Sequence, residues 1–95
     1  MNQPAIYILS NTRNTVLYIG VTSNLIQRVY QHKQKIIKGF SAKYNLTKLV
    51  YFEIYSDMEN AIVREKRLKQ WHRPWKERLI GEVNPDWRDL YFDLI

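Results

Sequence analysis

The chain contains no cysteine, which excludes disulfide bonds and any cysteine-based zinc site and fits a reducing cytosol. It also lacks an apolar run of about 20 residues, the length that a membrane-spanning helix needs. No basic segment leads into a long apolar stretch near the N-terminus, so we expect no signal peptide. Together these absences predict a cytoplasmic protein with no membrane partner.

Repeats, low-complexity segments and linkers are missing as well. A chain of 95 residues can bury one modest core. We therefore predict a single domain over residues 1–95, with its core at about 4–82 and a C-terminal tail at 83–95 that packs on the core.

Acidic residues are outnumbered, because 15 lysines and arginines face 9 aspartates and glutamates and give a net charge of +6. A basic protein favours polyanions through counterion release. Many of the basic residues cluster in the second half with tryptophans between them, although a solvated helix face is the commoner explanation of such a cluster. We predict that Trp71 stacks on a nucleobase. The residues predicted to contact backbone phosphates are Lys33, Lys66, Arg67, Lys69 and Arg73.

Two short apolar runs in the first half, 5–9 and 16–20, have the composition of strands and flank a turn-rich segment. This arrangement predicts an antiparallel hairpin that brings Tyr7 and Tyr18 close together. A helix should follow, since Thr22, Ser23 and Asn24 are good N-caps and Gln27 completes a capping box with Asn24. Its apolar stripe is expected to consist of Leu25, Val29 and Ile36.

The second half predicts one strand and two helices. The strand, residues 48–55, should direct Val50, Phe52 and Ile54 to one face. Ser56, in a capping box with Glu59, is expected to start a long helix over 57–73. A further helix should run from Pro74 to about residue 80 and end at Gly81, followed by an aromatic tail that caps the core. The predicted order is β-β-α-β-α-α.

Arg28 and His32 lie one helical turn apart at the edge of the apolar stripe, where the helix should meet the sheet. An arginine there can bind a phosphate in bidentate fashion and stabilise charge in a transition state. A histidine there can relay a proton. The alternatives are a surface salt bridge for Arg28 and a structural role for His32.

Glu65 interrupts the apolar stripe of the long helix. An unpaired buried carboxylate is costly, so this group should be paired, protonated or bound to a cation. A salt bridge to Arg28 or Lys69 is one possibility. The other is a single hydrated Mg²⁺ (or Mn²⁺) ion, which one carboxylate and phosphate oxygens can hold. Tyr7 is a poor base with its usual pKa near 10, so we expect Arg28 and such an ion to lower that pKa.

As a set, these residues resemble the GIY-YIG nuclease family, which is named after two triplets that correspond here to 5–7 and 18–20. Segments 18–24 and 64–71 are similar to its small stand-alone bacterial branch with a UvrC-type nuclease domain. Ala5 departs from the first glycine, and Val21 stands where several nucleases carry a lysine that Lys33 or Lys43 could replace. The residues that follow the family's order are Tyr7, Tyr18, Gly20, Arg28, His32 and Glu65, with Asn84 at a late asparagine of some members.

The resemblance implies a small single-domain α/β fold whose central, mostly antiparallel three-stranded sheet is flanked by helices. It also implies a metal-dependent endonuclease that hydrolyses DNA phosphodiester bonds in repair or recombination, on single-stranded or structured DNA. The implied catalytic residues are Tyr7, Tyr18, Arg28, His32 and Glu65, with Glu65 as the metal ligand. Two alternatives are a non-catalytic module that binds DNA or RNA, and a protein-interaction domain that uses its tryptophans.

Overall fold

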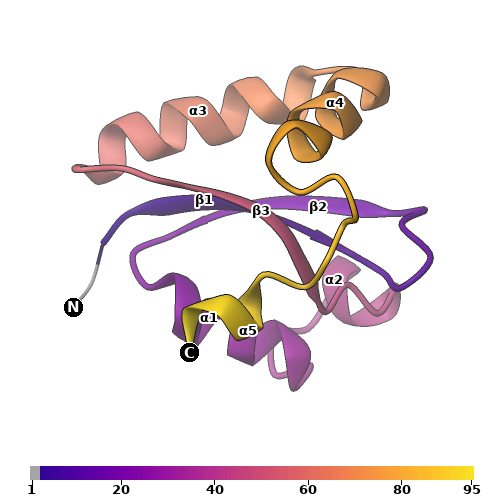
Figure 1. Ribbon diagram of the computed structural model, residues 1–95. Coiled ribbons are helices and arrows are strands. Elements are labelled where there is room, and N and C mark those ends of the chain that lie inside the picture. Colours follow the sequence, from indigo (N-terminus) through magenta and orange to yellow (C-terminus); the bar gives the residue numbers. More distant parts are fainter. Residues whose placement is uncertain (1–2) are drawn as a thin grey trace.

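In the computed structural model, which describes residues 3–95, a three-stranded antiparallel sheet lies between two layers of helices (Figure 1). Met1 and Asn2 lie outside the described residues. They belong to the predicted domain and to the N-terminal segment in which no signal peptide is expected. This architecture confirms the predicted α/β fold and adds two short helices, α2 and α5. The elements are β1 (Ala5–Ser10), β2 (Leu17–Thr22), α1 (Leu25–Lys33), α2 (Phe40–Lys43), β3 (Lys48–Ile54), α3 (Met58–Gln70), α4 (Arg73–Val83) and α5 (Tyr91–Leu94).

Strand β1 is the centre of the sheet, whose strand order is β2-β1-β3, and all its residues are buried. Helices α3 and α4 cover one face, and α1, α2 and α5 lie on the other (Figure 1). Because successive strand residues point to opposite faces, β1 contributes to two cores. Ala5, Tyr7 and Leu9 pack toward α1, whereas Ile6 and Ile8 pack toward α3 and α4.

A β-bulge in β3 overturns one prediction. Ile8 pairs with Tyr51 but Leu9 pairs with Leu49, so Val50 is an extra residue without a partner in β1. Val50 therefore packs with the α3 side of the sheet while Phe52 packs with the α1 side. The expectation that Val50 and Phe52 share a face is wrong, because it assumed an uninterrupted two-residue period.

Helix α1 begins as predicted, with the Asn24 side chain accepting a hydrogen bond from the Gln27 amide at 3.2 Å. It ends at Lys33, earlier than expected, because Lys35 adopts a left-handed backbone with φ of 55°. Ile36 is consequently 60 % exposed and does not belong to the apolar stripe.

Helices α3 and α4 also differ from prediction at their ends. The N-cap of α3 is Asp57 and not Ser56, since an Asp57 carboxylate oxygen accepts from the Asn60 amide at 2.8 Å. Gly81 does not end α4, because the buried Ile80 anchors the last turn and Asn84 caps the helix after Val83. None of the helices within residues 3–95 is long and apolar enough to cross a membrane.

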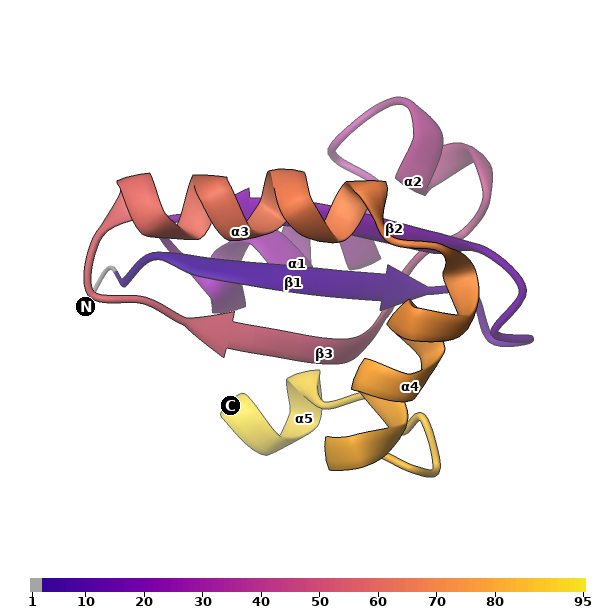
Figure 2. The same cartoon turned by 90° about the horizontal axis from the view of Figure 1, so that it is seen from above.

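The segment after α4 closes the outer edge of β3. The Asn84 side chain donates to the Val50 carbonyl at 3.0 Å, and the Leu90 amide donates to the Leu49 carbonyl at 2.7 Å. The Asp89 carboxylate accepts from the Leu49 amide at 3.1 Å and forms an ion pair with Lys33 of α1. Seen from above, α4 and α5 lie beside β3, at the far side of the sheet from β2 (Figure 2).

Candidate active site

Three of the predicted catalytic side chains meet where α1 packs on the sheet. Tyr7 comes from β1, Tyr18 from β2 and His32 from α1. The ring centroids are 6.2 Å apart for the two tyrosines, 5.6 Å for Tyr7 and His32, and 5.5 Å for Tyr18 and His32. The predicted proximity of the two tyrosines in the hairpin is thereby confirmed.

The register of the hairpin explains how the tyrosines approach each other. Tyr7 pairs with Gly20 and Tyr18 pairs with Leu9, so the two tyrosines are diagonal neighbours on one face. A β-carbon on Gly20 would lie 2.4 Å from the Tyr7 hydroxyl oxygen, which is closer than non-bonded atoms can approach. Gly20 is therefore needed for this close approach.

A buried chain of hydrogen bonds runs through the site. The Tyr7 hydroxyl is 2.9 Å from Nε2 of His32, and Nδ1 of His32 is 2.8 Å from Oγ of Ser41. All three side chains are buried, and no buried side-chain nitrogen or oxygen within residues 3–95 lacks a partner. Ser41 was not among the site residues predicted from the sequence, and no sequence pattern distinguishes it from a loop serine.

His32 is neutral at physiological pH. Burial lowers its pKa to about 4, and the nearby positive charge of Arg28 acts in the same direction. A neutral imidazole can accept a hydrogen bond at one ring nitrogen while it donates at the other. His32 can therefore link Tyr7 to Ser41 without carrying a charge.

The pKa of Tyr7 is raised, contrary to the expectation that it would be lowered. Burial is the main cause, and the neighbouring Tyr18 hydroxyl and the Glu65 carboxylate add to it. Arg28 acts in the expected direction, but its effect is smaller than that of burial. In the protein alone, the phenol of Tyr7 stays protonated at neutral pH.

Arg28 is half-buried beside this cluster, on the same helix as His32. Its guanidinium forms no hydrogen bond or ion pair with any residue among 3–95, so the predicted alternative of a salt bridge is not found there. It is nevertheless close enough to influence the pKa of both Tyr7 and His32. Five donors without a protein acceptor make this group suited to an incoming anion.

Glu65 approaches the site from α3, on the opposite side of the sheet. Its side chain is 12 % exposed and forms an ion pair with Lys69 at 2.8 Å, as one of the sequence alternatives proposed. The carboxylate contributes to the raised pKa of Tyr7, so the two groups interact electrostatically. Residues 3–95 contain no cluster of three or more His, Asp or Glu side chains that could bind a metal. One carboxylate suffices for hydrated Mg²⁺ that takes its other ligands from water and phosphate.

The predicted substrate-binding residues fall into two groups. Lys66, Arg67 and Lys69 are exposed on α3. Lys33 instead pairs with Asp89 and donates to the Thr47 carbonyl at 2.8 Å, which ties α1 to the tail. The contacts of Lys33 are therefore with the tail and not with Tyr7 or Tyr18.

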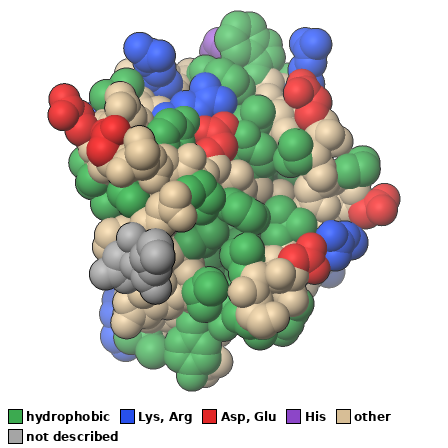
Figure 3. All heavy atoms as spheres, turned by 60° about the vertical axis from the view of Figure 1, so that its left-hand side comes forward, with side chains coloured by type: hydrophobic (Ala, Val, Ile, Leu, Met, Phe, Trp, Pro, Cys, Tyr) green, Lys and Arg blue, Asp and Glu red, His purple; other side chains and the backbone are tan. Residues whose placement is uncertain are grey.

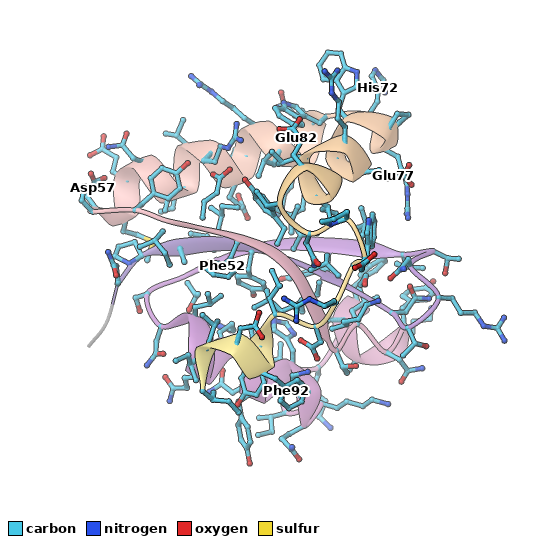
Figure 4. The ribbon with its side chains drawn as sticks, viewed as in Figure 1. Phe52, Asp57, His72, Glu77, Glu82 and Phe92 are labelled. Atoms are coloured by element: carbon cyan, nitrogen blue, oxygen red, sulfur yellow. The ribbon has the colours of Figure 1, made fainter. Side chains whose placement is uncertain are left out.

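Arg73 and Trp71 also make internal contacts. Arg73 donates to the carbonyls of Asn14 and Thr15 at 2.6 and 2.7 Å and so fastens α4 to the β1–β2 turn. Trp71 is partly buried against the core, with Arg64 5.2 Å from its ring centroid. Figure 4 shows His72 on the outer side of the α3–α4 layer, away from the sheet. On the face drawn in Figure 3, charged side chains of both signs are scattered among hydrophobic ones.

The sequence resembles two groups of proteins. A UPF0213 protein from Pectobacterium carotovorum is 38 % identical over 78 residues, which cover 81 % of this chain and 77 % of the relative. The UvrABC system protein C of Mycoplasma mycoides is 32 % identical over 73 residues, or 75 % of this chain. This chain covers only 12 % of that larger protein.

The fold also has a counterpart among solved structures. The solution NMR structure of a UPF0213 protein from Bacillus halodurans has a TM-score of 0.58 and 22 % identity, covering 94 % of this chain and 93 % of that one. Residues 3–78 match the family model of the GIY-YIG catalytic domain, a span that includes both tyrosines, Arg28, His32 and Glu65. The resemblance seen in the sequence is thus confirmed, and the chain belongs to the GIY-YIG nuclease domain family.

Proposed function

We propose that this chain is a metal-dependent endonuclease that hydrolyses phosphodiester bonds in single-stranded or structured DNA. The observation that carries the proposal is the buried Tyr7–His32–Ser41 chain next to the Arg28 guanidinium, which has no partner among residues 3–95. Membership of the GIY-YIG family supports a nuclease. The similarity to UvrABC system protein C supports a role in DNA repair.

Arg28 binds the scissile phosphate in this proposal. A guanidinium can form two parallel hydrogen bonds to a phosphate and then stabilise the extra charge of the transition state. In this proposal the Tyr18 hydroxyl, on the edge strand β2, donates a further hydrogen bond to the same phosphate. The net charge of +6 steers a polyanion toward the protein.

Tyr7 and His32 move the proton of the attacking water. The Tyr7 oxygen accepts a proton from the water while its own proton passes to Nε2 of His32, 2.9 Å away. This step needs a neutral imidazole, which the pKa of about 4 provides. It also needs the proton on Nδ1, where the Ser41 hydroxyl, 2.8 Å away, is able to accept a hydrogen bond from it. Because no free phenolate has to form beforehand, the raised pKa of Tyr7 does not prevent the reaction.

Glu65 would hold a single Mg²⁺ or Mn²⁺ ion, together with water and phosphate oxygens. Such an ion would stabilise negative charge on the phosphate and on the leaving oxygen. Lys69 would then share the carboxylate or move away from it, which its 52 % exposed side chain permits.

Cleavage of a panel of labelled substrates tests the proposal. Single-stranded, duplex, flap and four-way-junction DNA, and the matching RNA strands, are each incubated with Mg²⁺, with Mn²⁺ or with EDTA. We expect cleavage of at least one single-stranded or branched DNA in Mg²⁺ and none in EDTA. No cleavage of any substrate with either metal would refute the nuclease, and undiminished cleavage in EDTA would refute its metal dependence.

A second candidate is a nucleic-acid-binding module that does not cleave. The Glu65–Lys69 ion pair favours it, because this pair neutralises the carboxylate that would hold the metal. Such a module would bind with a steep salt dependence and leave every substrate intact. Replacing the exposed Lys66 and Arg67 by glutamine should lower the slope of log affinity against log salt by about 1 for each lost phosphate contact.

A further inference from the structure

Two exposed aromatic rings lie beside the site, one on α2 and one on the residue that caps it. The Phe40 ring stacks on Tyr18 with centroids 6.5 Å apart and planes 27° apart. The Tyr44 ring lies 4.7 Å from Phe40. Phe40 is 49 % and Tyr44 is 41 % exposed, so a continuous aromatic surface leads from Tyr18 to solvent.

The aromatic surface is tied to the site through the residues next to Phe40. Ser41, the residue after Phe40, is buried and bonded to His32 through its hydroxyl at 2.8 Å. Gly39, the residue before it, has a φ of 112°, a conformation that side chains rarely tolerate. Through the bond of Ser41, Phe40 is held close to His32, so a ligand bound to Phe40 lies near the proposed reacting groups.

The half of the chain that carries these rings is basic, which favours an anionic ligand. All nine acidic residues of the chain follow residue 52, while Arg13, Arg28 and five lysines precede it. Lys43, on α2 itself, lies with its Nζ 5.4 Å from the Tyr44 ring centroid. Exposed aromatic rings that alternate with basic side chains are the typical surface for single-stranded nucleic acids.

We propose that Phe40 and Tyr44 bind an unpaired nucleobase next to the scissile phosphate, so that the strand is single-stranded at the point of cleavage. This inference rests on the proposed function, because it takes the phosphate to lie at Tyr18 and Arg28. In a duplex both faces of each base are covered by neighbouring bases. Only an unpaired base can therefore stack on the platform formed by the Phe40 and Tyr44 rings. Lys43 then contacts the adjoining phosphate.

Binding in EDTA separates this inference from the nuclease activity, since it needs no cleavage. The affinities of one single-stranded oligonucleotide, its RNA counterpart and its duplex are measured by fluorescence anisotropy for Phe40→Leu and Tyr44→Leu. Leucine keeps the apolar volume but removes the aromatic face. Loss of one base–aromatic stack should weaken single-strand binding by about 5- to 100-fold. Duplex binding should change less than about twofold by the same reasoning.

Tyr30→Leu is the matched control, because Tyr30 is 49 % exposed on α1 and forms no ring contact with residues 3–95. Its affinity for every strand should match that of the parent protein. A 2-aminopurine placed in the single strand gives a second signal, because its fluorescence is quenched by stacking. The quenching should be lost in Phe40→Leu and retained in Tyr30→Leu.

Unchanged single-strand affinity in both platform variants would overturn the inference, as would equal losses for single strand and duplex. Thermal melting establishes that each variant is folded, and if Phe40→Leu does not fold, Tyr44→Leu decides. If the variants show these losses of single-strand binding but the parent protein never cleaves, the base-stacking inference stands and the nuclease proposal is refuted. If the parent protein cleaves but Phe40→Leu and Tyr44→Leu bind single strands normally, the nuclease proposal stands and the base-stacking inference is refuted.

Discussion

The Tyr7 ring occupies the space that a side chain on residue 20 would fill. The two residues are paired in the β1–β2 hairpin, and a β-carbon at Gly20 would lie 2.4 Å from both the hydroxyl oxygen and the ring carbon that bears it. The tyrosine of the first triplet and the glycine of the second thus form one structural unit. Absence of a side chain at residue 20 allows the phenol to reach His32.

Gly20→Ala should therefore displace Tyr7. We expect a loss of about 1–3 kcal/mol in the free energy of unfolding, typical of overpacking, and a loss of most cleavage activity. Gly81→Ala is the matched control, since nothing lies within 4 Å of its added methyl group in α4. It should stabilise the protein by about 0.5–1 kcal/mol through helix propensity. Urea denaturation and a cleavage assay measure both effects, and equal stabilities of the two variants would contradict the steric argument.

Tyr7→Phe removes the hydroxyl and keeps the ring. Cleavage should become undetectable, because the proposed proton relay loses its first member. His32 would lose its Nε2 partner, so we expect about 1–2 kcal/mol of destabilisation from an unsatisfied buried group. Tyr18→Phe should slow cleavage less, because Tyr18 only helps to hold the phosphate. Single-turnover rates compare the two variants. A Tyr7→Phe rate close to that of the parent protein would refute the role of Tyr7 and point to His32 as the base.

Arg28 should be irreplaceable by lysine. Arg28→Lys keeps a positive charge but not the bidentate geometry, so its cleavage rate should fall about 100-fold, as for the loss of an oxyanion donor. Affinity for substrate in EDTA should change only a few fold for both Arg28→Lys and Arg28→Ala. Parallel losses in affinity and rate would show that Arg28 merely positions the strand.

Glu65→Gln tests the metal against the salt bridge. The variant should be folded and inactive, since a half-exposed ion pair contributes at most about 1 kcal/mol to stability. Lys69→Met breaks the same ion pair but leaves the carboxylate, so at saturating substrate it should keep or raise the cleavage rate and lower the Mg²⁺ concentration needed for half-maximal cleavage. Its affinity for DNA should fall modestly, because Lys69 is also a predicted phosphate contact. If Lys69→Met is as inactive as Glu65→Gln, the ion pair and not the metal is the important interaction.

The pKa of His32 predicts an acid-sensitive fold. Its pKa of about 4 lies below the usual 6.5, so the unfolded chain binds a proton more readily than the folded protein. The contribution of His32 to the free energy of unfolding should be fully present above pH 6.5. The free energy of unfolding should then decline by about 3 kcal/mol as the pH falls to 4. The carboxylate of Glu53, whose pKa is also lowered, loses its contribution at still more acidic pH. His32→Gln lacks the first decline, so denaturation at pH 7 and pH 4.5 should show a smaller difference for the variant.

Local patterns predicted the elements that carry the site. The two tyrosines lie on strands of a hairpin, and Arg28 and His32 lie on a helix whose cap at Asn24 was correctly identified. Both the hairpin and the helix cap depend on residues that are close together in the sequence. Sequence periodicity therefore sufficed to place these four side chains at the junction of helix and sheet.

Long-range packing decided what the sequence could not predict. The carbonyl of the extra residue Val50 in β3 accepts a hydrogen bond from the Asn84 side chain, 34 positions away in the sequence. The pKa of Tyr7 was misjudged because burial, which outweighs Arg28, follows from packing of the whole core. Ser41 could not be identified, since only the folded chain shows that it meets His32.

The bonds from Asn84, Asp89 and Leu90 to β3 have a practical consequence for handling the protein. An unpaired strand edge is a template for intermolecular pairing and aggregation, and these residues occupy the edge at Leu49 and Val50. A recombinant protein shortened before Asn84 would retain every proposed catalytic side chain and yet be prone to precipitate. Affinity tags are better attached beyond Ile95, which is 69 % exposed, than substituted for the last dozen residues.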